Sequence, residues 1–199
     1  RDISDADNAS RLIELHGEIL HFVPAWKKWL RFSDHEQRWI EDHANVQVHE
    51  LAKDVGQRLK LDAFKIADRT DAKKKFHHAL KSLSNTAIES MVKLARGIKG
   101  IPLDHELLDS DPWLLGVRNG VLDLKTGECS PADPANLMTM QCAVAFDENA
   151  DCLRWDAVNE DWFPDQEVRD YVQRVAGSAL VGAQRDHAFI IHYGGGRNG

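Results

Sequence analysis

The chain has 199 residues, a formal net charge of −7, 43% hydrophobic and 29% charged residues, values typical of a soluble globular protein. Six Trp and seven Phe supply apolar area for a packed core, which excludes intrinsic disorder. The acidic total charge excludes a strongly basic nucleic-acid module but not a local basic face. The sequence contains no run of about 18 apolar residues, the length that a membrane-spanning helix needs. We therefore expect no membrane partner.

The cysteines indicate whether the chain holds disulfides or zinc, and the two ends indicate whether it belongs to a longer protein. Cys129, Cys142 and Cys152 are an odd number without a Cys-x-x-Cys pair, which argues against a disulfide scaffold and a zinc site. We expect three free thiols and no metal site. Because the chain begins at Arg1 and ends inside a glycine-rich run, we expect it to be a fragment of a longer protein.

The first elements predicted are a helix and a small sheet. Ser4 followed by Asp7 resembles a capping box, Leu12 and Ile13 lie on one helical face, and Gly17 stops the helix. From residue 18 to residue 43 the pattern changes to short alternating runs that are rich in Trp. These runs predict an antiparallel meander of three strands.

Two stripes of apolar residues at helical spacing follow. The first predicts a helix through Val48, Leu51, Ala52, Val55 and Leu59. The second predicts one long helix, ended by Gly97, through Phe76, Leu80, Leu83, Ala87, Met91 and Leu94.

The middle of the chain returns to strand patterns. Asn119-Gly120 between two apolar runs predicts a β-hairpin in which these two residues are the centre of a tight turn. Thr126-Gly127 predicts a second turn, and residues 137–146 predict a longer strand.

Helices are predicted again in the last third. Asp151 is expected to cap a helix that holds Leu153, Trp155, Val158 and Trp162, and Asp165 to cap another with Val168, Val172 and Val175 inward. The apolar run within residues 187–193 predicts a buried strand.

A glycine-rich run comes directly after that strand: Gly194, Gly195, Gly196, Arg197, Asn198 and Gly199. Gly194 and Gly199 have the spacing of a phosphate-binding P-loop, G-x-x-x-x-G-K-[ST]. The Lys and the Ser or Thr would be residues 200 and 201. A plain glycine-rich turn is the alternative.

The block Asp111–Glu128, with the sequence DPWLLGVRNGVLDLKTGE, resembles the signature of phage and plasmid primase–helicases. This family is related to the poxvirus primase–helicase and belongs to the superfamily III helicases. Further resemblances follow in order along the chain: Asp5–Leu12, Trp29, Arg38-Trp39, Asp147–Cys152, Trp155, Tyr171–Arg174, Gly177, Leu180–Gly182 and Gly194–Gly199 as the Walker A motif. The run Ala25–Lys28 departs from the glycine-rich turn expected in the family's first hairpin.

The resemblance implies a role in DNA replication, in the domain that precedes a helicase. Such a domain would orient or oligomerise the ATPase and guide DNA. ATP and Mg²⁺ would bind only in the longer, hexameric protein, a cytoplasmic protein of a phage, prophage or plasmid in a bacterial host. The 199 residues alone are expected to be inactive and to bind DNA weakly.

The sequence contains two candidate surfaces for binding nucleic acid. Trp26, Lys27, Lys28, Trp29 and Arg31, followed by Phe32, interleave basic and aromatic residues on the predicted first hairpin, a pattern that can stack bases and hold phosphates. Lys73, Lys74, Lys75 and Lys81 form a basic helix start. The alternative for both is that the tryptophans belong to the core and the lysines to a solvated face.

Asp109 and Asp111 offer an alternative class of function. Paired aspartates can hold Mg²⁺ for nucleotidyl transfer, or they can cap a turn that leads into a strand. A scaffold that never contacts DNA is a third possibility. The sequence as a whole predicts an α+β fold, with an α+β domain over 1–150 and, over 151–199, a helical lead-in and the first strand and P-loop start of an ATPase domain.

Overall fold

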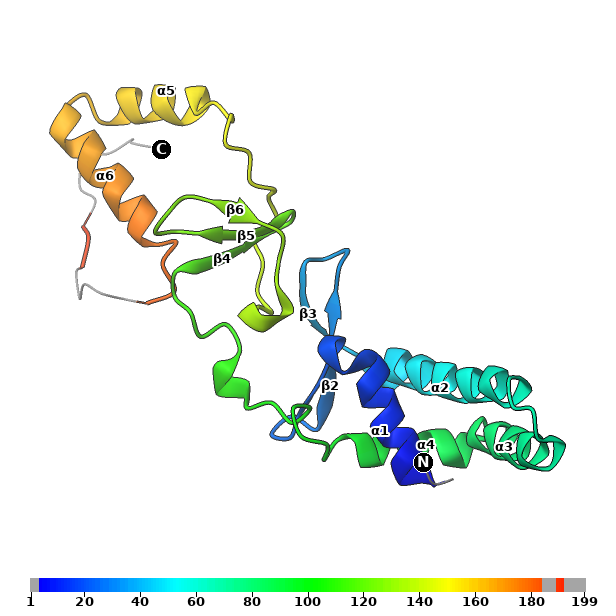
Figure 1. Ribbon diagram of the computed structural model, residues 1–199. Coiled ribbons are helices and arrows are strands. Elements are labelled where there is room, and N and C mark those ends of the chain that lie inside the picture. The colour runs from blue at the N-terminus through cyan, green and yellow to red at the C-terminus, as the bar shows by residue number, and fades with distance from the viewer. Residues whose placement is uncertain (1–3, 184–188, 192–199) are drawn as a thin grey trace.

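The structure is a computed structural model that describes residues 4–183 and 189–191. A helical body, two small sheets and a final pair of helices follow one another in an elongated molecule (Figure 1). The helices and strands are α1 (Asp5–His16), β1 (Leu20–Val23), β2 (Lys28–Ser33), β3 (Arg38–Glu41), α2 (Val46–Phe64), α3 (Arg69–Ser82), α4 (Asn85–Ala95), β4 (Leu114–Val117), β5 (Gly120–Asp123), β6 (Cys129–Ser130), α5 (Leu153–Trp162) and α6 (Gln166–Ser178). The predicted α+β class is confirmed, and no described helix meets the length and apolarity of a membrane span.

Side-chain caps begin most of the helices. At α1 the predicted N-cap is present, because the Ser4 hydroxyl accepts from the Asp7 amide at 3.1 Å, while the Asp7 carboxylate accepts from the Ser4 hydroxyl. The start of α2 carries a cap that the sequence analysis missed. The buried Asp42 carboxylate accepts from the amides of Gln47 and Val48 at 2.9 and 2.8 Å, which satisfies donors that the first helical turn leaves open.

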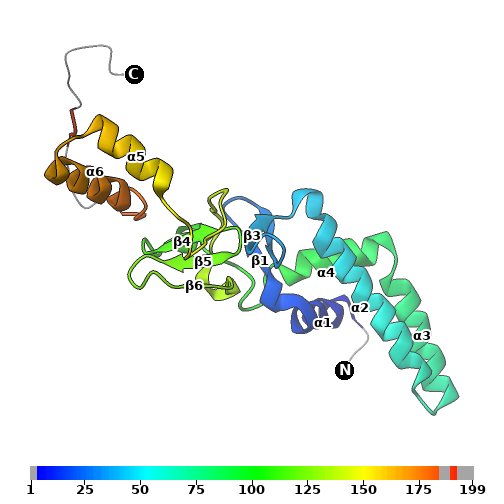
Figure 2. The same cartoon turned by 90° about the horizontal axis from the view of Figure 1, so that it is seen from above.

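The long helix predicted from Phe76 to Leu94 is wrong in one respect: it is two helices. The break lies after Ser82, where the Ser84 hydroxyl accepts from the amide of Ala87 and caps α4. A serine at this position competes with helix continuation by bonding to the backbone. As a result α4 packs beside α1 while α3 pairs with α2, and this α2–α3 hairpin projects from the body (Figure 2).

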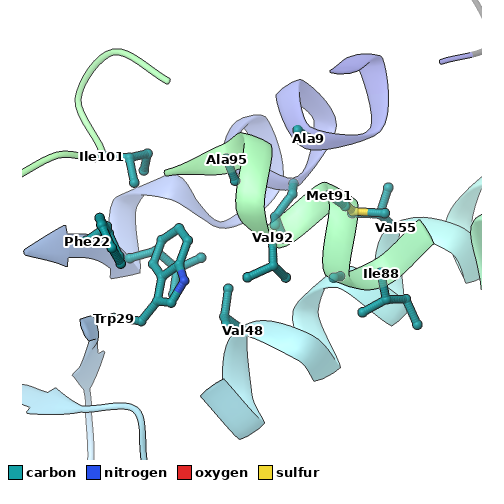
Figure 3. Packing of buried hydrophobic residues seen from close by; sticks show 13 residues of the cluster. Ala9, Phe22, Trp29, Val48, Val55, Ile88, Met91, Val92, Ala95 and Ile101 are labelled. Atoms are coloured by element: carbon teal, nitrogen blue, oxygen red, sulfur yellow. The ribbon is translucent and has the colours of Figure 1, made fainter. Parts of the chain in front are cut away.

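The main core lies between one face of the first sheet and the helices α1, α2 and α4 (Figure 3). Phe22 and Trp29 are paired across β1 and β2, and their rings meet edge to face at 5.5 Å. Trp29 is fully buried against Val48 and Val92 of the helices. Burial of such large apolar side chains is the main stabilising contribution here.

The opposite face of the first sheet carries a second cluster, made of Val23, Leu30, Phe32 and Trp39. The segment after the second sheet covers it. The indole of Trp39 donates to the carbonyl of Pro134 at 2.8 Å, and the Trp39 amide donates to that of Met138 at 2.8 Å. The three-stranded antiparallel meander is confirmed, with strand order β1-β2-β3.

The Asn-Gly hairpin is confirmed, but its turn is displaced by one residue. Val117 pairs with Gly120, so the two turn residues are Arg118 and Asn119. Gly120 begins β5 with φ +151°, and a Cβ there would lie 2.0 Å from the carbonyl oxygen of Ser130. The glycine is therefore required by the close approach of β6 and not by the turn centre. The second predicted turn is present, with Gly127 at φ +78°.

The strand predicted over 137–146 is wrong, because this segment is irregular. It nevertheless runs beside β4, to which it is joined by hydrogen bonds from the Cys142 amide to Gly116 and from the Arg118 amide to Val144. A Cβ on Gly116 would lie 2.3 Å from the carbonyl oxygen of Met140. The alternating apolar pattern therefore reflects a segment packed along a strand edge without a regular ladder.

The last two helices agree only partly with the predictions. Asp165 caps α6 by accepting from the Glu167 amide at 2.8 Å, as predicted. Asp151 does not cap α5, whose N-cap is Cys152 without a side-chain hydrogen bond. The predicted burial of Val168, Val172 and Val175 is also wrong, because α6 has no buried residue.

The three cysteines are free thiols, as predicted. Cys129 and Cys142 are half-buried and Cys152 is exposed.

The close approach at Gly116 generates a stability prediction. Gly116→Ala should destabilise the protein by about 1–3 kcal/mol, because the new methyl group meets a backbone oxygen that cannot move away cheaply. Gly177→Ala is the matched control: it lies within α6 with nothing within 4 Å of its Cβ position. That change should be neutral or stabilise by up to about 1 kcal/mol. Urea unfolding of both variants measures the difference in the free energy of unfolding. Equal effects would contradict the claim that the chain near Met140 leaves no space for a Cβ on Gly116.

Candidate nucleic-acid interface

The P-loop residues predicted from the sequence, Gly194 to Gly199, lie outside the described residues. Of the strand predicted over 187–193, only residues 189–191 are described, and these are not in a strand. The P-loop assignment therefore stays a prediction, and the surfaces that can be built from side chains lie earlier in the chain.

The five residues of the predicted strip on the first hairpin separate into different environments. Trp29 is fully buried in the main core, so it does not offer a face for base stacking. Arg31 is half-buried in the middle of β2, where it pairs with Leu20 and Ile40. Trp26, Lys27 and Lys28 remain accessible at the turn between β1 and β2.

Trp26 has the most accessible aromatic ring of this strip. Its side chain is 45% exposed, and its ring packs edge to face on His105 at 5.8 Å. It borders a depression of about 410 Å³ whose other walls include Arg38, Glu41 and His43. Trp26 and Trp39 both line this depression, whose volume lies within the range of small-molecule sites.

The charges around that depression are largely compensated. Lys28 Nζ lies 2.7 Å from Glu41 Oε2, and Arg38 forms an ion pair with Glu36 at 2.6 Å. The hydrogen bond from Lys28 lowers the pKa of Glu41, so this carboxylate stays ionised. Lys28 and Arg38 therefore each have an acidic neighbour, whereas Lys27 forms no ion pair with any residue in 4–183 or 189–191. The strip thus offers phosphates one accessible unpaired lysine, which gives little net attraction.

The carboxylates of Asp109 and Asp111 both accept hydrogen bonds from backbone amides. Asp109 accepts from the Thr139 amide at 2.7 Å and the Met140 amide at 3.0 Å, and also from the Thr139 hydroxyl. Asp111 accepts from the amide of Trp113 at 2.9 Å. No cluster of three or more possible metal ligands occurs in the described part of the chain. Asp111 is therefore the turn-capping residue that the alternative interpretation expected, whereas Asp109 joins this turn to the distant Thr139–Met140 segment.

A second basic surface lies on α3, at positions spaced by four residues: Arg69, Lys73, His77 and Lys81. All four side chains are exposed. The sequence analysis noted the lysines but missed their common face. The signal that would have found it is the i, i+4 spacing, which aligns side chains on a helix.

Comparisons with known proteins agree with the resemblance carried by the Asp111–Glu128 block. Residues 9–164 match the sequence family described as "D5 N terminal like". The chain belongs to this D5 N terminal like family. The match spans the helical body, both sheets and α5. The sequence analysis predicted membership in the phage- and plasmid-type primase–helicases, and the match confirms that the chain belongs to a phage and viral primase–helicase family.

The chain is also similar to a curated viral protein, a "putative helicase L207/L206" of Acanthamoeba polyphaga mimivirus. The two sequences are 26% identical over an alignment of 193 positions, and the match covers 86% of this chain and 20% of the viral protein. This D5 N terminal like chain therefore spans about one fifth of the length of that relative.

Two partly buried histidines generate a pH prediction. Burial lowers the pKa of His21, which packs on Trp39 at 4.6 Å and hydrogen-bonds to the Ile101 carbonyl. Burial also lowers the pKa of His78, which lies 3.3 Å from the buried Asn8 side chain. As the pH falls below the ordinary value of 6.5, the unfolded chain takes up these protons before the folded chain does. The free energy of unfolding should therefore decrease from pH 7.5 to pH 5.5.

Urea unfolding at the two pH values measures this decrease. The double variant His21→Gln/His78→Gln should show a smaller decrease than the wild type, and His35→Gln, on the turn between β2 and β3, is the matched control. If the double variant loses as much stability on acidification as the wild type, these histidines are not the groups responsible.

Proposed function

We propose that this chain is the domain that precedes the ATPase of a DNA-replication helicase and that α5 and α6 dock onto that ATPase. The family membership and the similarity to a viral protein described as a putative helicase support the general role. The exposure of apolar residues on α5 and α6 is the observation that carries the specific one.

The apolar face of α5 is open to solvent. Trp155, Val158 and Trp162 recur at helical spacing, and the two tryptophan side chains are 44% and 65% exposed. Large apolar side chains gathered on one exposed face mark interaction surfaces. On α6, Val168, Tyr171, Val172 and Val175 form a second such stripe, with Val168 and Tyr171 exposed.

Both ends of this helical pair are tied to the β4–β5 hairpin or to the residues just before it. The Asn119 side-chain amide donates to the carbonyl of Phe146 at 2.9 Å and accepts from the Phe146 amide at 2.8 Å. Phe146 lies in the segment that leads into α5. After α6, the Gly182 amide donates to the carbonyl of Pro112 at 2.9 Å. A pair held at both ends is a suitable platform for a following domain.

The proposed partner is an ATPase that begins with the predicted P-loop at Gly194–Gly199. In the longer protein these glycines, with a Lys at 200 and a Ser or Thr at 201, would hold the phosphates of ATP and Mg²⁺. We expect the longer protein to self-associate as a hexamer. The 199-residue chain, without that Lys and hydroxyl, should not hydrolyse ATP.

A scaffold without any DNA contact is the second candidate function. The pairing of Lys28 with Glu41 beside the β1–β2 turn favours it for that surface. The basic face of α3 argues against it for the chain as a whole.

The docking proposal predicts the behaviour of Trp155→Ser/Trp162→Ser in the longer protein that contains the ATPase. ATP turnover and the assembled mass measured by light scattering should both fall, turnover by about tenfold or more. The double variant Asp156→Ser/Glu160→Ser changes the opposite, polar face of the same helix and should leave both unchanged.

The melting temperature of the 199-residue chain separates docking from misfolding. It should hardly change with either double variant, because the substituted side chains are largely exposed. Normal assembly and normal turnover of the tryptophan variant would contradict the proposal.

A further inference from the structure

The α2–α3 hairpin concentrates positive charge in an acidic protein. From Val55 to Leu83 the chain carries eight Lys or Arg residues and three Asp residues, a formal charge of +5, whereas the whole chain carries −7. The hairpin also projects from the helical body (Figure 2), which leaves its outer surface open. Such a local basic region can attract a polyanion although the total charge repels it.

The cations of α3 are arranged as a ridge. Arg69, Lys73 and Lys81, with His77 between them, lie at spacings of four and are exposed. Arg69, Lys73 and Lys81 form no ion pair with any residue in 4–183 or 189–191. Lys74, on a neighbouring face, is only loosely paired, 3.9 Å from Asp71. The ridge is about 18 Å long, which matches about five phosphates along one strand of B-DNA.

Aromatic side chains lie at the tip of the hairpin. Phe64, at the end of α2, is 70% exposed and meets Phe76 of α3 edge to face at 5.4 Å. Lys60 Nζ lies 5.8 Å from the centre of the Phe76 ring. Phe76 is half-buried, so Phe64 is the ring of this pair that is open to a base, with Lys60 nearby. A cation near an exposed aromatic ring is a combination that holds single-stranded nucleic acids.

The other end of the ridge has acidic neighbours. Asp5 and Asp7 of α1 act on His78 together with Arg11 and Lys81. The attractive surface therefore extends from the tip towards Lys81 and ends at α1.

We propose that the exposed face of α3, with Arg69, Lys73 and Lys81 as the contacting cations, binds the phosphate backbone of a nucleic-acid strand. The proposal rests on the proposed role in DNA replication for its choice of polyanion. It places the contact on α3 instead of on the Trp26–Arg31 strip, whose Lys28 is paired with Glu41 and whose Trp29 is buried. Lys27 is the one accessible lysine of that strip without an ion pair in residues 4–183 and 189–191.

The test is fluorescence anisotropy with the 199-residue chain and a labelled 20-nucleotide oligo-dT, over a range of salt concentrations. The variant Arg69→Gln/Lys73→Gln/Lys81→Gln should bind about tenfold or more weakly at low salt. For this variant, the slope of log affinity against log salt concentration should become shallower by about 2, because three phosphate contacts are lost. A duplex of 20 base pairs, measured in parallel, shows whether one strand suffices.

The matched control also removes three positive charges: Lys27→Gln/Lys28→Gln/Lys125→Gln. It should bind oligo-dT within about twofold of the wild type. An equal loss in both variants would show that only total charge matters, and a loss in the control alone would place the contact on the β1–β2 turn. Either result overturns the proposal, as would the absence of any binding by the wild type.

Polyglutamate of matched charge is the competitor that separates nucleic acid from an acidic polypeptide. It should displace oligo-dT poorly, and displacement at equal concentration would overturn the choice of ligand. Circular dichroism verifies that all variants are folded. Because the docking experiment on α5 contains no DNA, failure of the ridge and failure of the proposed function are distinguishable.

Discussion

The close packing of three backbone segments around the β4–β5 hairpin is the constraint on which the second half of the structure depends. At Gly116 the chain passing Met140 leaves no space for a Cβ, and at Gly120 the chain passing Ser130 leaves none either. Between them, Asn119 uses both polar atoms of its amide on the backbone of Phe146. Two glycines and one asparagine thus decide where three later segments can lie.

This arrangement explains physically why the Asp111–Glu128 block has its composition. Asp111 caps the turn before β4, and the carbonyl of Pro112 receives the chain as it leaves α6. The block therefore fixes both the entry and the exit of the α5–α6 pair. Asp109, just before it, holds Thr139 and Met140, and Met138 in turn meets Trp39 of the first sheet. One short hairpin connects the helical body to the helices that we propose dock onto an ATPase.

Features that depend on neighbouring residues could be predicted from the sequence, whereas features that depend on distant residues could not. Helix caps such as Ser4 and Asp165, and the glycine turn at Gly127, depend on neighbouring residues, so they could be predicted. Trp26 and Trp29 could not be separated by sequence, because strand register and the position of the helices decide which ring is buried. Residues 137–146 alternate like a strand, but their hydrogen bonds are set by β4 and Asp109, which lie far away in the chain. The apolar faces of α5 and α6 were predicted to point inward for the same reason. An amphipathic pattern predicts that a face is covered but does not identify the segment or partner that covers it.

The central claim is that the β4–β5 hairpin holds the segment leading into α5, and amide hydrogen exchange at Phe146 tests it most directly. In the wild type this amide donates to Asn119 Oδ1 at 2.8 Å and should be protected. In Asn119→Ala its protection should collapse, while the Cys142 amide, bonded to the carbonyl of Gly116, keeps most of its own. Rapid exchange of Phe146 in the wild type, or protection that is unchanged in Asn119→Ala, would contradict the account.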